Sequence, residues 1–357
     1  MFTAIATAAT SVSPGRTASS FTRGVRRIGG GAWAQTASRL LTRALLSPGP
    51  RGLSRRCFAA AATAPGKASA LISPDEAEAL LEKGGAGVKI IDASWHMPNS
   101  GRNGREEHIR GPRLPGAVFF DIDEASDKSS SLPHMMPSSS EFAAYVGGLG
   151  IGSADTLVVY DTQGIFSAPR VWWMFRRFGH PDVRVLNGGL PAWEAASKPI
   201  ESAAVAAGDS RRSGGSFEPR PVQGMVVPIE ELDGVLRAKE AAVLDARSAG
   251  RFDGTVPDPR GARPGHMPGA ANVPFDQLLD EKGRMRPVPE LRTVFDKFDL
   301  SGGAVTTCGS GVTAAIISLA LFECGYRNPS HQRLYDGAWA EWGSDERYPV
   351  SAVETQE

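Results

Sequence analysis

The feature that most restricts the fold of this 357-residue chain is an internal repeat, because the second half follows the same order of elements as the first. In each half an expected helix precedes an apolar strand with an Asp, then a Gly-Ala turn, a second strand and a closing turn with Trp. The main strands are expected at residues 88–92, 156–160, 242–247 and 304–308. Strands that alternate with helices form parallel sheets. The sequence therefore predicts an α/β chain of two tandem domains, each a mostly parallel sheet flanked by helices.

The domain boundaries are expected where the composition changes. Residues 206–224 are rich in Gly, Pro and Ser, which is typical of a connector between domains. Just after the leader, Ser73 and Glu76 form the pattern of a capping box that opens a helix. The predicted organisation is given by residue number: a leader at 1–66, a first domain at 67–205, a linker at 206–224 and a second domain at 225–350.

The leader differs in charge from the rest of the chain. Residues 1–73 contain no Asp or Glu but carry nine Arg and one Lys, so removing them leaves 29 of 39 basic residues against 39 acidic ones, a net charge of −10. This composition is typical of an organellar presequence, and the segment from Arg56 through Cys57 to Ala59 resembles a mitochondrial processing signal. We expect a mitochondrial-matrix protein. A plastid location, a dual location with the cytoplasm, and a basic tail that stays attached are the alternatives.

Composition also argues against several classes of partner. The acidic mature chain is a poor match for nucleic acid, and no apolar run approaches the twenty residues of a membrane span. The three cysteines, Cys57, Cys308 and Cys324, have no CxxC spacing and no accompanying His cluster. We therefore expect neither a disulfide framework nor a metal site, and no cofactor. Cys324 is expected on the helix that follows Cys308, as a core residue, with a redox role left open.

Cys308 begins the loop Cys308-Gly-Ser-Gly-Val-Thr313, which follows an apolar strand and opens an apolar helix. Gly309 and Gly311 let the backbone curl around the thiol, and Thr313 is expected to cap the helix. Backbone amides and a helix N-terminus stabilise a thiolate, which is the nucleophilic form of cysteine, and would also stabilise a persulfide anion. The first half has Asp161 in place of Cys308. The first domain is therefore expected to complete the site without a nucleophile of its own.

Together these motifs resemble the tandem-domain sulfurtransferases of the rhodanese superfamily over residues 70–345. Four segments carry the resemblance: residues 167–175, residues 250–270, the loop 308–313 and the closing Tyr335-Asp-Gly-Ala-Trp339. Thiosulfate sulfurtransferases place Arg and Lys directly after their cysteine, where this chain has Gly309 and Ser310. The loop is similar to that of the 3-mercaptopyruvate sulfurtransferases. Thiosulfate is a dianion, whereas 3-mercaptopyruvate carries one carboxylate. The absence of the two loop cations therefore favours 3-mercaptopyruvate as the sulfur donor.

The resemblance implies a reaction and a set of site residues. Sulfur would pass from 3-mercaptopyruvate through a Cys308 persulfide to thioredoxin or another thiol acceptor, or to cyanide in vitro, with release of pyruvate. The implied substrate contacts are the guanidinium groups of Arg251 and Arg260 and the loop residues Gly309, Gly311, Val312 and Thr313. A proton relay of Ser310, His134 and Asp123 would assemble across the domain interface. Arg247, Arg263 and His108 are expected to be structural.

Three other functions compete with this hypothesis. A thiosulfate:cyanide sulfurtransferase would use the same site with a different donor. A phosphatase loop of the Cys-x5-Arg type would need an arginine at the sixth position after Cys308, where the chain has Ala314. A sulfide or redox sensor would show modification of Cys308 without turnover. Residues 108–117 resemble the family's His-Ile-Pro-Gly-Ala motif with an insertion, which puts the path of the chain towards Asp123 in doubt.

Overall fold

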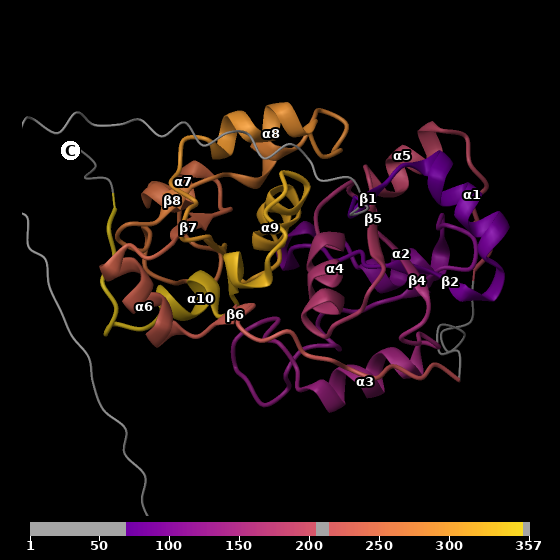
Figure 1. Cartoon of the computed structure of the whole chain (residues 1–357), viewed down its shortest axis with the longest axis horizontal. Coiled ribbons are helices and arrows are strands. Elements are labelled where there is room, and N and C mark those ends of the chain that lie inside the picture. Colours follow the sequence, from indigo (N-terminus) through magenta and orange to yellow (C-terminus); the bar gives the residue numbers. More distant parts are fainter. Residues whose placement is uncertain (1–68, 205–213, 353–357) are drawn as a thin grey trace, which may run out of the picture. The chain divides into compact units, whose positions relative to one another are not determined.

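The computed structural model describes residues 69–204 and 214–352. The expected leader, with Cys57, and the first part of the expected linker, residues 206–213, lie outside the described residues. The strands form two five-stranded sheets with the orders β1-β5-β4-β2-β3 and β6-β10-β9-β7-β8, and every strand pair is parallel (Figure 1). The second order repeats the first, element for element. The α/β fold with two parallel sheets, predicted from the repeat, is confirmed.

The first sheet and its helices extend from residue 71 to residue 195. Buried apolar strands alternate with helices, as the pattern of the sequence requires. The strands are β1 (Leu71–Ile72), β2 (Val88–Asp92), β3 (Val118–Phe119), β4 (Thr156–Tyr160) and β5 (Val183–Leu186). The helices are α1 (Pro74–Gly84), α2 (Gly104–Arg110), α3 (Ser139–Gly148), α4 (Ala168–Arg177) and α5 (Gly189–Ala195), with 3-10 turns η1 (Gly85–Gly87) and η2 (Pro98–Ser100).

The second sheet and its helices extend from residue 226 to residue 342. The strands are β6 (Val226–Val227), β7 (Ala242–Asp245), β8 (Ala271–Asn272), β9 (Ala304–Thr307) and β10 (Gln332–Tyr335). The helices are α6 (Ile229–Ala238), α7 (Ala249–Asp253), α8 (Val288–Phe295), α9 (Ala314–Glu323) and α10 (Ala338–Trp342), with 3-10 turns η3 (Phe275–Leu278) and η4 (Pro329–His331). In the described residues no helix is long and apolar enough to cross a membrane.

Side-chain caps begin the helices α1, α2 and α3. Ser73 and Glu76 form the predicted capping box at the start of α1. At the start of α2 the Asn103 side chain accepts a hydrogen bond from the Glu106 amide. One expectation was wrong. Thr313 stands at the N-cap position of α9, but its side chain makes no capping hydrogen bond, because its backbone is already helical.

The cores of the two halves meet at α4 and α9, which contact each other. Trp172 and Trp173 of α4 are fully buried, and α9 is buried along nearly its whole length, so its apolar residues need not be confined to one face. The ring of Trp172 packs edge-on against Phe322, with 5.6 Å between ring centroids. These aromatics are core and interface residues, as expected for side chains with a large apolar surface.

The sheet register places Asp161 and Cys308 at equivalent positions in the two halves. Asp92 of β2 pairs with Tyr160 of β4, and Asp245 of β7 pairs with Thr307 of β9. The next residues, Asp161 and Cys308, therefore leave equivalent central strands at their carboxyl ends. In parallel α/β sheets this edge is where ligands bind.

Candidate active site

Cys308 lies in the loop between β9 and α9 and is 2% exposed. The Gly311 amide donates a hydrogen bond to its sulfur at 3.1 Å, and Gly311 adopts a φ of 80°, which favours glycine. The loop is also held from outside: the amides of Trp339 and Ala340 donate to the carbonyls of Cys308 and Gly309 at 2.9 and 3.0 Å. The closing Tyr335–Trp339 motif thus fixes the position of the nucleophile.

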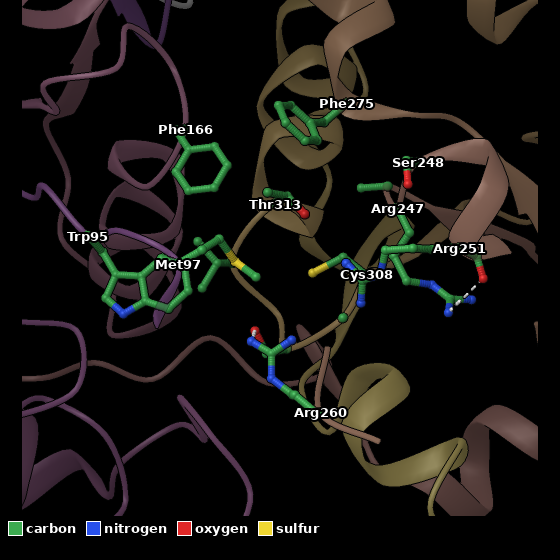
Figure 2. Close-up of a pocket in the computed structure, with 14 residues that line it drawn as sticks. Trp95, Met97, Phe166, Arg247, Ser248, Arg251, Arg260, Phe275, Cys308 and Thr313 are labelled. Carbon is green, nitrogen blue, oxygen red and sulfur yellow. Dashed lines mark hydrogen bonds between the residues drawn. The ribbon is translucent and has the colours of Figure 1, made fainter. Parts of the chain in front are cut away.

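The Cys308 thiol points into a cavity of about 280 Å³ (Figure 2). Both halves of the chain line this cavity, as expected for a ligand site between domains. The first half contributes Trp95, Met97 and Phe166. The second contributes Ala246, Arg247, Ser248, Arg251, Arg260, Phe275, Cys308, Gly309, Ser310, Val312 and Thr313.

Arg251 and Arg260, both predicted from the resemblance, lie over the cysteine loop. A Cβ placed on Gly309 would lie 2.8 Å from Arg251 Nη2 and 3.3 Å from Arg260 Nη1. Arg260 Nη2 donates to the Ser310 hydroxyl at 3.0 Å. A side chain at position 309 would therefore displace the guanidinium groups, and Gly309 is not among the glycines with a positive φ.

Asp258 organises both arginines and was not recognised in the sequence. Its carboxylate pairs with Arg251 Nη2 at 2.5 Å through Oδ2 and accepts the backbone amide of Arg260 at 2.9 Å through Oδ1. The Asp258 side chain is 4% exposed. The Pro-Asp-Pro-Arg segment, with an acid two residues before the arginine, was the signal that could have found it.

Asp123 and His134 are brought together, despite the inserted residues that precede them. His134 Nδ1 lies 3.0 Å from Asp123 Oδ1, and the imidazole, opposed by burial, lowers the pKa of Asp123. Trp95 donates its indole N–H to Asp123 Oδ2 at 3.1 Å and packs edge-on against His134. Trp95 lines the cavity, whereas the Asp123–His134 pair does not. No hydrogen bond joins His134 to Ser310 in the described residues, so the second of the two contacts of the expected relay is not formed in this structure.

A buried ion pair ties the two halves together behind the loop. Arg170 of α4 is fully buried and its Nη2 lies 2.7 Å from Asp336 Oδ1. Arg170 also donates to the carbonyls of Gly311 and His134, and Asp336 accepts the Met136 amide at 2.6 Å. Both residues lie in segments that carry the family resemblance, but their spacing in the sequence does not predict that they pair. His134 has a φ of 61°, rare for a non-glycine residue, and its carbonyl is held by this arginine.

The first half contains the same kind of loop, with Asp161 at the position of the cysteine. Asp161 Oδ2 accepts three backbone amides, from Phe166, Ser167 and Ala168, at 2.9 to 3.0 Å, and Oδ1 accepts the Gln163 amide at 2.9 Å. Burial raises the pKa of Asp161, and the four amides oppose that shift. The loop after the central strand is therefore a cradle for an anionic side chain.

The remaining candidate residues are structural. Arg247 pairs with Asp245 at 2.7 Å, and His108 Nδ1 lies 2.8 Å from Asp92 Oδ2. Arg263 holds the chain around the end of α10, because its guanidinium group donates to four backbone carbonyls there. Cys324 lies just beyond α9, as its C-cap, and burial raises the pKa of its thiol to about 11. The described residues contain no group of three or more His, Cys, Asp or Glu side chains placed to hold a metal ion.

Several known proteins are similar to this chain in both sequence and fold. The rhodanese-like domain family matches residues 73–196 and 229–345. The human 3-mercaptopyruvate sulfurtransferase is 42% identical over 74% of this chain and 89% of its own length. The Arabidopsis thaliana thiosulfate/3-mercaptopyruvate sulfurtransferase 1, mitochondrial, is 40% identical over 75% of each chain. The crystal structure of SseA from Escherichia coli, a 3-mercaptopyruvate sulfotransferase, superposes with a TM-score of 0.67 at 35% identity, over 76% of this chain and 99% of that one.

This chain belongs to the rhodanese-like domain family and contains two copies of the domain. The resemblance that the sequence motifs suggested is thereby confirmed.

Proposed function

We propose that this protein is a 3-mercaptopyruvate sulfurtransferase that works through a Cys308 persulfide. The observation that carries the proposal is the distribution of charge around the thiol. Two guanidinium groups, from Arg251 and Arg260, lie over the loop, while the two residues after the cysteine, Gly309 and Ser310, bring no charge of their own. The planar carboxylate of 3-mercaptopyruvate suits the planar guanidinium groups of arginine. The second negative charge of a dianion such as thiosulfate would find no cation in the cysteine loop.

The first half-reaction follows from this arrangement. The donor carboxylate and ketone bind the guanidinium groups, which orients the thiol of 3-mercaptopyruvate towards Cys308. The Cys308 thiolate attacks that sulfur, an S–S bond forms, and the C–S bond breaks. The electron pair of the C–S bond passes to the CH2 carbon and the adjacent ketone as pyruvate enolate. The Ser310 hydroxyl, held by Arg260, is the group proposed to deliver the proton that converts the enolate into pyruvate.

The second half-reaction restores the enzyme. The outer sulfur of the persulfide is attacked by the thiolate of thioredoxin or of a small thiol, and the Cys308 thiolate leaves. Cyanide would accept the same sulfur as thiocyanate. Between the two steps the Gly311 amide, which already donates to the Cys308 sulfur, stabilises the anionic intermediate. Two separate half-reactions predict ping-pong kinetics.

His134 and Asp123 are proposed to support the site from the first domain. Their contact with the cavity is through Trp95, which lies between the cavity and the pair. A direct relay to Ser310 would require the imidazole to approach the hydroxyl when the donor binds. The loop positions Gly309, Gly311, Val312 and Thr313 are proposed to surround the transferred sulfur.

Location and domain boundaries are part of the same proposal. A mitochondrial protein is supported by the acid-free leader, and one relative bears the word mitochondrial in its name. The proposed domains are residues 67–205 and 225–350, with a leader at 1–66 and a linker at 206–224.

The test is a comparison of kcat/KM for 3-mercaptopyruvate and thiosulfate with the mature protein. We expect 3-mercaptopyruvate to be the better donor, and Ser310→Lys to move the preference towards thiosulfate by placing a cation beside the thiol. If the native protein already prefers thiosulfate, the proposed donor is wrong and the chain is a thiosulfate:cyanide sulfurtransferase. If neither donor is turned over while Cys308 is modified by sulfide, the sensor hypothesis replaces both.

A further inference from the structure

Asp258 holds a position from which it can control the charge of the cavity. One carboxylate oxygen pairs with the Arg251 guanidinium and the other accepts the Arg260 backbone amide. The side chain is nearly buried, so water screens this carboxylate little. Asp258 therefore fixes both substrate-facing arginines and places a negative charge directly behind one of them.

The cavity lining carries three guanidinium groups, and their partners differ. Arg247 is paired with Asp245 and Arg251 is paired with Asp258. Arg260 donates to a hydroxyl group and has no carboxylate within ion-pair distance among the described residues. Two of the three charges are thus balanced by built-in carboxylates. The arginines of the lining and their carboxylate partners are left with one net positive charge, apart from the Cys308 thiolate, and this charge matches the single carboxylate of an α-keto acid.

Arg251 still has a donor to offer despite its pairing. Its side chain lines the cavity and is 20% exposed, so a bound donor can still contact the guanidinium group. Asp258 consequently balances the positive charge of Arg251 without covering its guanidinium group.

We propose that Asp258 is a specificity-determining residue, which makes the cavity selective for a monoanionic sulfur donor over a dianionic one. The proposal rests on the proposed sulfur transfer. It assigns the preference to a carboxylate outside the cysteine loop, in addition to the missing loop cations. If Asp258 is neutralised, the lining gains one positive charge, and a dianion gains about twice as much attraction from it as a monoanion.

The experiment measures kcat/KM for 3-mercaptopyruvate and for thiosulfate with Asp258→Asn and Asp258→Glu. In Asp258→Asn we expect the ratio of thiosulfate efficiency to 3-mercaptopyruvate efficiency to rise about tenfold, since one extra charge at partly screened range is worth about one decade. The increase should shrink at high salt. Asp258→Glu keeps the charge and should keep the ratio, even where both efficiencies fall. Asp233→Asn, which breaks an Asp–Arg pair on α6 away from the cavity, is the matched control.

The outcomes distinguish a failure of the specificity proposal for Asp258 from a failure of the proposed sulfur transfer through Cys308. If wild-type protein forms no persulfide with either donor, the proposed function fails. If wild-type protein transfers sulfur and Asp258→Asn lowers both efficiencies by the same factor, Asp258 is a structural residue and only the specificity proposal is overturned. A ratio that rises equally in Asp258→Asn and Asp258→Glu would also overturn it, because the charge would not be the cause.

Discussion

The pair of Arg170 and Asp336 gives the sharpest test of how the two halves are joined. Arg170→Met leaves the Asp336 carboxylate 2% exposed and without its cation, and Asp336→Asn leaves a fully buried guanidinium without its anion. Breaking one partner of a buried ion pair costs about 3–5 kcal/mol. The double variant leaves neither charge unpaired, so we expect its loss to be about 2 kcal/mol, well below the sum of the single losses.

The assay is urea unfolding, followed in parallel by tryptophan fluorescence and far-UV circular dichroism. Coincident transitions are required before the free energy of unfolding is compared between variants. The predicted coupling energy, the sum of the two single losses minus the loss in the double variant, is about 4–8 kcal/mol. Since Arg170 also donates to the Gly311 carbonyl, Arg170→Met should lower kcat/KM as well as stability. Single variants that each lose less than about 1 kcal/mol, with additive effects in the double variant, would refute this account of the interface.

Three further predictions concern the site. Gly309→Ala should raise the KM of the donor about tenfold, the equivalent of one hydrogen bond to a charged group, because a Cβ there lies 2.8 Å from Arg251 Nη2; an unchanged KM would contradict the role of that space. At pH 8, iodoacetamide should alkylate Cys308 but spare Cys324, whose pKa is about 11, as read by peptide mass mapping; equal labelling would contradict it. Asp123 has a lowered pKa, so its stabilising contribution is present above about pH 4 and is lost as the pH falls through the folded value. The melting temperatures of wild type and Asp123→Asn should thus converge in acid; a difference independent of pH would oppose this.

The sequence was sufficient to predict the sheets, because their signals are local. The apolar runs expected at 88–92 and 304–308 and the capping box at Ser73 depend on neighbouring residues. The structure has β2 and the capping box where they were expected, and β9 ends one residue earlier, at Thr307. Helix α2 was missed although Asn103 and Glu106 have the spacing of a cap and its third helical residue. The segment is short and polar, so it lacks the apolar periodicity that predicts a helix, and the capping pattern alone did not indicate one.

The site was only partly predictable, for a physical reason. Cys308, Arg251 and Arg260 were found through motifs, whereas the pairing of Arg170 with Asp336 joins residues from different domains and leaves no local spacing to read. The same holds for the relay: the motifs indicate its members, but only coordinates reveal that Trp95 stands between the cavity and the Asp123–His134 pair. Long-range packing decides which of the polar residues actually meet.

The most direct test of the central claim is the intact mass of the mature protein after incubation with 3-mercaptopyruvate in the absence of an acceptor. We predict a gain of one sulfur atom, located on Cys308, that disappears when thioredoxin or cyanide is added and never forms in Cys308→Ser. A protein that turns over 3-mercaptopyruvate without this adduct, or that gains the same sulfur in Cys308→Ser, would contradict the persulfide mechanism.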